Sequence, residues 1–281
     1  MKKLEEQFFK TLMILATLLI VGSFFGIIFT ILKKGLPAMN MDMITQIPQG
    51  GYYQGSKGGV LNAIAGSLFL ALGASALALA ASLPIVMYLN VYLKKSSVLG
   101  RITRLSFDVL FGIPSIVYGT FAFTLMIYFG NKASLLAGII TVAALVVPVM
   151  VRTMDEAFRS CPKELSDAAY SLGATRWETA KVLVLQAVSG IQTAVLLAFG
   201  RAIGDTAAVM FTAGFGDHIP SSLASPAPTL PLAIFFQLSS PSEAVQARAY
   251  ASALILTFIV LVISIASRLL GKRLQKNKTR S

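Results

Sequence analysis

The feature that most constrains this chain is a series of long apolar runs. A helix needs about 20 mainly apolar residues to cross the hydrocarbon core of a bilayer. Six runs approach or exceed that length, at 11–32, 61–93, 107–129, 133–151, 184–213 and 250–270. Only 13% of the 281 residues are charged, whereas a soluble domain has about a quarter. The sequence therefore predicts an all-α membrane protein with six transmembrane helices.

Basic residues are distributed unevenly around these runs. With six spans, four basic groups fall on the same side: Lys2, Lys3 and Lys10; Lys94, Lys95, Arg101 and Arg104; Arg152, Arg159, Lys163, Arg176 and Lys181; Lys272, Arg273, Lys276, Lys278 and Arg280. The other side has fewer, and Lys33-Lys34 is the local exception. Since cytoplasmic loops carry the excess of Lys and Arg, we expect both termini in the cytoplasm and a multi-pass protein of the cytoplasmic membrane. The net charge of +12 then reflects topology, and we expect no nucleic-acid partner.

A polar segment between the fourth and fifth runs has helical signals of its own. Pro162 suits the first turn of a helix, and Leu165, Ala168, Ala169 and Leu172 follow with helical spacing. Gly173 stands where a helix usually stops, because glycine adopts the left-handed conformation without strain. Thr175 and Glu178 have the spacing of a capping box. The sequence predicts a helix, a glycine bend and a second helix that enters the next span unbroken.

Other signals concern packing and loops. The second run is rich in small residues, including Gly66, Gly73 and Ala74, which allow close helix packing in lipid, so we expect a packed bundle. Pro84, Pro114 and Pro148 are expected to bend their helices, and at Pro114 a functional role is an equal alternative. In the Ser- and Pro-rich loop before the last run, the apolar 230–238 predicts a short helix at the membrane interface.

Two ionisable residues lie inside the fifth run. Arg201 and Asp205 are four residues apart, which places them on one face of a continuous helix. Charges at membrane depth usually face a bundle interior or an aqueous path, and a guanidinium matches tetrahedral oxyanions. They are therefore candidates for substrate translocation, the alternative being a self-neutralising pair that only fixes packing. Arg152 is a further candidate, with a simple cytoplasmic anchor as its alternative.

The sequence does not predict an enzyme. It contains no phosphate-binding loop of the nucleotide-binding type, no set of nucleophile, histidine and acid, and no zinc spacing. His218 and Cys161 are single, and neither has the neighbouring ligands that a metal needs. We therefore expect no catalytic residue, no metal and no cofactor, and the energy for any transport must come from another subunit.

Three stretches carry a resemblance to a known family. Asp167-Ala168-Ala169 with Gly173, Leu183 and Leu185 resembles the coupling loop of ABC importer permeases, with Asp167 in place of the usual Glu and Gln186 in place of the usual Pro. Residues 112–119 (GIPSIVYG) and 200–207 (GRAIGDTA) resemble those of the PstA-type phosphate permeases. So do the shorter 58–61 and 229–232, and the resemblance covers most of the chain from about Gly58 onward.

This resemblance implies a type I importer bundle with a cytoplasmic coupling hairpin at about 155–183. It divides the chain into an N-terminal span with an external loop (1–57) and a permease domain of five spans (58–281). It implies a PstC-like second permease, a PstB-like ATPase dimer and an external PstS-like phosphate-binding protein, besides membrane lipid. Arg201 then becomes a translocation residue, and docking on the ATPase falls to Leu165, Asp167, Ala168, Ala169, Leu172 and Gly173.

Three other functions remain open from the sequence. One is a permease for another oxyanion or for a polyamine, since the external binding protein largely selects the substrate. A second is a channel or secondary transporter that works alone, although no internal repeat of the kind common in such proteins is evident. The third is a membrane-embedded enzyme, for which no convergent acid–base set is present.

The distribution of charge makes a topology testable. Reporter fusions at Gly173 and Lys276 should be active in the cytoplasm, and fusions at Gln54 and Ser225 should be active outside, because the basic clusters favour the cytoplasmic side. An external position of Gly173 would contradict the six-span arrangement and the docking of this segment on a cytoplasmic partner.

Overall fold

A computed structural model describes residues 2–49, 57–94 and 96–278, so Gln54, Lys95 and Arg280 lie outside the described residues. Nearly all of the described chain is helical. The helices are α1 (Lys2–Gly35), α2 (Met41–Thr45), α3 (Leu61–Met87), α4 (Val98–Phe111), α5 (Ser115–Tyr128), α6 (Leu135–Arg159), α7 (Lys163–Ser171), α8 (Arg176–Gln186), α9 (Val188–Gly204), α10 (Leu230–Leu238) and α11 (Glu243–Lys278). A 3₁₀ turn (Leu36–Ala38) follows α1, a π-helical turn (Tyr88–Tyr92) follows α3, and β1 (Pro48–Gln49) pairs antiparallel with β2 (Lys57–Gly58).

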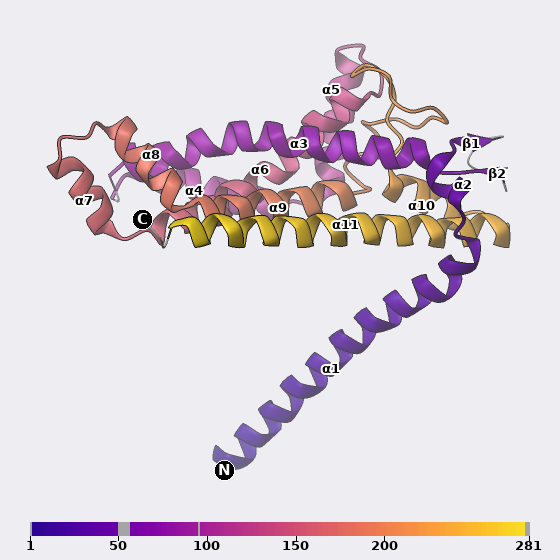
Figure 1. Ribbon diagram of the computed structural model, residues 1–281, viewed down its shortest axis with the longest axis horizontal. Helices are drawn as coiled ribbons and strands as arrows, with labels where there is room; N and C mark the ends of the chain where they lie inside the picture. The colour runs from indigo at the N-terminus through magenta and orange to yellow at the C-terminus, as the bar shows by residue number, and fades with distance from the viewer. Residues whose placement is uncertain (1, 50–56, 95, 279–281) are drawn as a thin grey trace.

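The long helices form an elongated bundle with distinct ends. Figure 1 shows α3, α6, α9 and α11 running along the same axis, with α7 and α8 at one end and α2, α10 and the β-hairpin at the other. The described C-terminal end of α11 lies near α7 and α8. In the same view α1 diverges from the bundle, and it is the C-terminal end of α1 that meets α11, where Gly35 packs against Tyr250.

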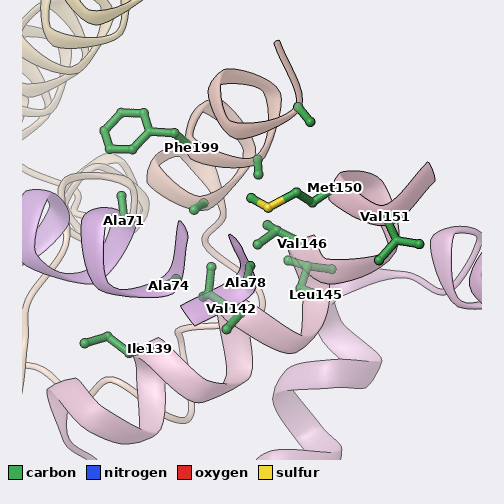
Figure 2. Close-up of a cluster of buried hydrophobic side chains, with 14 of the residues drawn as sticks. Ala71, Ala74, Ala78, Ile139, Val142, Leu145, Val146, Met150, Val151 and Phe199 are labelled. Atoms are coloured by element: carbon green, nitrogen blue, oxygen red, sulfur yellow. The ribbon is translucent and has the colours of Figure 1, made fainter. Parts of the chain in front are cut away.

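The core of the bundle is the contact between α3 and α6, with α9 laid across both. Ala71, Ala74 and Ala78 present one fully buried face of α3 to branched side chains of α6 (Figure 2). At Gly73, an added Cβ would approach the Ile139 side chain to 2.6 Å. The predicted packed bundle is thus confirmed, and small residues permit the close approach. The α6 residues of this cluster include Ile139, Val142, Leu145, Val146, Met150 and Val151.

The predicted number of spans is confirmed with a qualification. Among the described residues, α1, α3, α6 and α11 are each long and apolar enough to cross a membrane. The pairs α4–α5 and α8–α9 also pass this test, and the total reaches six if each pair is one span. The third span is bent by 97° next to Pro114, where the sequence predicts a bend. The predicted continuity of the second hairpin helix with the fifth span is wrong, because α8 and α9 are bent by 68°.

The bend in the third span follows from its sequence. Pro114 has no amide hydrogen to continue α4 and instead precedes α5, with an extended ψ of 141°. The amides of Gly112 and Ile113 turn back to Val109 and Leu110, which closes the end of α4. Pro84 and Pro148, in contrast, lie inside α3 and α6, which both continue past them.

The fifth span is interrupted twice. α8 ends at Gln186, so the expectation that a non-proline residue there leaves the helix unbroken is wrong. Close tertiary packing surrounds the break: Ala187, between the two helices, is buried, and in the first turn of α9 a Cβ added at Gly190 would come within 2.2 Å of the Ala157 Cβ. α9 then ends at Gly204 rather than continuing to 213.

The predicted helix at 230–238 is confirmed as α10, and its place at the membrane interface stays a prediction. Leu230, Leu232 and Ala233 are buried, and α10 packs against α11 and α3. The Leu230 amide donates to the Ser67 hydroxyl at 2.8 Å. Next to it, the Pro228 carbonyl lies directly over Gly66, where an added Cβ would approach the oxygen to 2.0 Å.

This contact generates a stability prediction. Gly66→Ala should lower the free energy of unfolding in detergent by about 1–3 kcal/mol, because the backbone of Pro228 cannot yield to the added methyl group. Gly22→Ala is the matched control, since an added Cβ there meets nothing within 4 Å, and alanine favours the helix. Equal unfolding free energies for the two variants would show that the α3–α10 contact is looser than described.

Candidate functional site

The segment between α6 and α9 forms the predicted helix–bend–helix, which we call the docking hairpin (α7, the bend and α8). The capping box at the start of α8 is confirmed: the Glu178 amide donates to the Thr175 hydroxyl at 3.3 Å, and the Thr175 amide donates to the Glu178 carboxylate at 2.8 Å. These bonds satisfy amides that the first turn of a helix leaves unpaired. The second helix therefore has a defined start.

Gly173 closes α7 as predicted. Its φ of +82° lies in the left-handed region. The Gly173 amide donates to the Tyr170 carbonyl at 2.9 Å and the Ala174 amide donates to the Ala169 carbonyl at 3.0 Å, which together form a Schellman motif. This motif fixes the direction in which the chain leaves α7 and thus the shape of the hairpin tip.

The predicted docking residues do not form one uniform face. Leu165 is half-buried and packs on the bundle core, and Ala169 is also half-buried. Asp167, Ala168 and Leu172 are exposed, with Leu172 at 89%. Tyr170, to which no sequence motif points, and Trp177 are large and exposed as well. An apolar surface therefore lies at the tip of the hairpin, beyond the bundle.

A second candidate site lies at the bend between α4 and α5. Phe111 is the last residue of α4, and two guanidinium groups approach its ring: that of Arg152 at 5.5 Å and that of Arg201 at 5.8 Å from the centroid. Both distances are within the range of cation–π attraction. We call these three residues the arginine corner. The structure thus brings together two candidates that are far apart in the sequence.

The two arginines differ in their partners. Arg152 lies 3.6 Å from the Asp108 carboxylate and 3.7 Å from the Glu156 carboxylate. All three side chains are at least half exposed, so the ion pairs contribute little to stability. Arg201 is joined to no carboxylate by an ion pair within the described part of the chain. Its charge is therefore available to a ligand.

The expectation that Arg201 and Asp205 share a helical face is wrong. α9 ends at Gly204, and Asp205 is extended, with φ −79° and ψ 126°. The Asp205 carboxylate instead accepts the Ala208 amide at 2.8 Å. Short acidic side chains often bond to the backbone in this way and so compete with helix formation. Asp205 shapes the turn after α9 and does not neutralise Arg201.

The same turn brings two sequence motifs into contact. Gly119 of α5 is packed so closely on the turn that an added Cβ would come within 2.7 Å of the Ala207 carbonyl. The rings of Phe123 and Phe211 lie 5.7 Å apart and extend this contact. Residues 112–119 and 200–207, which carried the family resemblance, therefore form one structural unit. Beside Arg201, Gly200 and Gly204 face open space, since an added Cβ at either meets nothing within 4 Å.

Sequence reasoning missed a buried charged cluster one turn from the arginine corner. Asp155 of α6 is buried, and its carboxylate is bound by Arg104 of α4 and by Asn90 of the π-helical turn. The available signal was a polar Asn90 at the end of an apolar run, but its partner lies 65 residues away.

The remaining single residues add no site. His218 is exposed in the loop after α9, and no group of three or more potential metal ligands occurs in the ranges that the structure describes. Cys161 is half-buried and its sulfur lies 3.5 Å from the Ala157 carbonyl. Trp177 is exposed, with the Lys181 ammonium 5.4 Å from its ring centroid.

Comparison with known proteins gives a consistent result. Residues 80–279 match the family described as binding-protein-dependent transport system inner membrane component. The phosphate transport system permease protein PstA of Yersinia pestis is 35% identical over 245 residues, which cover 87% of this chain and 82% of that protein. The probable phosphate transport system permease protein PstA of Methanocaldococcus jannaschii is 30% identical over 271 residues, covering 95% and 94%.

A solved structure supports the fold independently. The chain resembles a structure of inward-facing conformations of the MetNI methionine ABC transporter, with a TM-score of 0.61 and 17% identity. The match covers 75% of this chain and 94% of that one. The expected type I importer bundle is thereby confirmed.

Proposed function

We propose that this chain, which belongs to the family of binding-protein-dependent transport system inner membrane components and within it to the PstA-type permeases, passes inorganic phosphate through the membrane as one subunit of an ATP-driven importer. The observation that carries the proposal beyond family membership is the arginine corner. Two guanidinium groups flank Phe111 at the point where the two family-like motifs meet.

The chemistry of the corner suits a tetrahedral anion. A guanidinium donates two parallel hydrogen bonds to a phosphate, and its charge persists at all physiological pH values. Arg201 has the freer charge and is proposed as the primary contact. Arg152 shares its charge with Asp108 and Glu156, so it adds attraction without holding the anion permanently. Asp205 acts indirectly, because its bond to Ala208 shapes the turn beside Arg201.

The docking hairpin supports a separate source of energy. Its exposed apolar tip, with Leu172, Tyr170 and Trp177, suits an apolar groove on an ATPase, and we propose a PstB-like dimer in that role. A second, PstC-like permease would complete the path at the exposed side of the arginine corner. A PstS-like binding protein would deliver phosphate from outside.

The proposed assembly implies an orientation of the chain in the membrane and a division of the chain into two parts. We propose that the docking hairpin and both termini lie in the cytoplasm, in keeping with the basic clusters. The protein then resides in the inner, or cytoplasmic, membrane, with α10 toward the outside. We also propose that 1–57 is a peripheral span with its external loop and that 58–281 is the permease domain, since α1 diverges from the bundle in Figure 1.

The alternatives fit the structure less well. Two adjacent guanidinium groups repel a polyamine, which is itself a cation. A channel or secondary transporter that works alone would have no use for an exposed apolar hairpin tip. Another oxyanion, such as sulfate, shares the chemistry of phosphate at a guanidinium, so the uptake experiment needs competition between the two anions.

Uptake by the reconstituted transporter tests the proposal. Proteoliposomes that contain this chain and its three partner components should accumulate radiolabelled phosphate when ATP is present, and excess sulfate should not compete. In Arg201→Lys, phosphate uptake should fall about tenfold or more, because a hydrogen bond to a charged group contributes about 1.5–3 kcal/mol and Lys lacks the planar fork.

Arg101→Lys provides the matched control for that experiment. Arg101 is an exposed residue of α4, away from the Phe111 ring, so its replacement should leave uptake unchanged. If Arg201→Lys transports phosphate as well as Arg101→Lys does, Arg201 is not an anion contact. If the unaltered transporter moves sulfate and not phosphate, the proposed substrate is wrong.

A further inference from the structure

The buried cluster around Asp155 lies where the docking hairpin leaves the bundle. Asp155 is on α6, one turn before that helix ends at Arg159, and is only 6% exposed. Arg104 of α4 donates to both oxygens of its carboxylate, from Nε at 2.8 Å and from Nη2 at 3.0 Å. Asn90 donates a third hydrogen bond at 2.7 Å. A buried carboxylate is thus held by two other elements of the bundle in a bidentate geometry, which is both strong and directional.

Asn90 connects the cluster to an irregular part of α3. It lies in the π-helical turn Tyr88–Tyr92, and its side-chain amide also donates to the Val86 carbonyl at 3.0 Å. Although π-helical turns are rare, they often occur at functional sites. The Asp155 carboxylate binds the irregular turn that follows α3.

A cleft separates this cluster from α7. Asn90 and Arg104 line it on the bundle side, and Lys163, Asp167 and Tyr170 line it on the hairpin side. The cleft thus separates part of α7 from Asn90 and Arg104, whereas Leu165 packs on the core and α8 contacts the π-helical turn. The cleft leaves room for α7 to shift, and two members of the Asp155 cluster, Asn90 and Arg104, line it.

The cluster also leads to the arginine corner. Arg104 and Asp108 are one turn apart on α4, and Asp155 and Arg152 are nearly one turn apart on α6. Two ion pairs therefore join the same two helices in series: the buried Arg104–Asp155 pair and the exposed Asp108–Arg152 pair. Phe111, whose ring contacts Arg152 and Arg201, follows at the end of α4. A movement of α4 together with α6 would move Phe111 and Arg152 relative to Arg201 of α9.

We infer that Asp155, Arg104 and Asn90 form a coupling latch that transmits movement of the docking hairpin to α4 and so to the arginine corner. This inference rests on the proposed function. The three are positioning residues, because none of them contacts the proposed anion path. The latch keeps α4, α6 and the end of α3 together as one unit when the hairpin moves, since breaking it would expose an uncompensated buried charge.

The test measures the number of phosphate ions transported for each ATP hydrolysed by the complete reconstituted transporter. Asp155→Asn keeps the shape of the side chain and removes its charge. The complex should assemble and hydrolyse ATP, while the transport-to-hydrolysis ratio falls about tenfold, within the 5- to 150-fold range of typical coupling between sites. A purely structural role would lower both rates together and leave the ratio unchanged.

The matched control is Asp42→Asn, which removes an exposed carboxylate of α2 that accepts a hydrogen bond from Gln46, the residue after that helix, and it should not alter the ratio. If Asp155→Asn does not assemble, Arg104→Lys and then Asn90→Ser replace it, and the first variant that assembles decides. An unchanged ratio in that variant overturns the latch. If the unaltered transporter moves no phosphate, the proposed function fails instead, so the two failures are distinguishable.

Discussion

The close contact between α3 and α6 is the constraint on which the rest of the structure depends. In lipid there is no hydrophobic force to hold apolar helices together, so close packing and polar contacts between helices must do so. Ala71, Ala74 and Ala78 leave room for the branched residues of α6, and at Gly73 the Ile139 side chain fills the space of a missing methyl group. α9 then lies across both helices and contributes Phe199 to the same cluster (Figure 2).

The contact between α3 and α6 positions both functional regions, the docking hairpin and the arginine corner. α6 is buried in the core as far as Phe158 and ends at Arg159, shortly before the docking hairpin begins, so the hairpin continues directly from a core helix. Asp155 and Arg152 of α6 lie against α4. α4 is amphipathic and lies along the edge of the core. The bend at Pro114 then turns α5 back over the end of α9, and the contact of Gly119 with Ala207 holds Arg201 beside Phe111.

The sequence was sufficient where structure is decided locally. The capping box at Thr175, the left-handed Gly173 and the helix at 230–238 were all predicted correctly, because each depends on residues within a few positions of one another. The spans were located approximately for the same reason, although the fifth ends at Gly204 rather than at 213. The division into 1–57 and 58–281 and the roles of the site residues remain proposals.

The errors concern features that distant residues decide. An apolar run predicts burial in lipid but not direction, so the bend in the fifth span could not be predicted, whereas Pro114 marks the bend in the third. α8 ends before the buried Ala187, and α9 ends where Asp205 bonds to Ala208 instead of continuing the helix. The Asp155 cluster was hidden because its partners lie 51 and 65 residues away. Only the fold places these polar residues together.

The central claim is that energy reaches the bundle through a docking hairpin whose exposed tip binds a separate ATPase. Leu172 is 89% exposed at that tip, so Leu172→Arg tests the claim without disturbing the core. The account predicts that the variant inserts normally into the membrane but no longer co-purifies with the ATPase. Met41→Arg, a change at an exposed residue at the opposite end of the bundle, should retain the ATPase. Normal ATPase binding and phosphate uptake by Leu172→Arg would contradict the account.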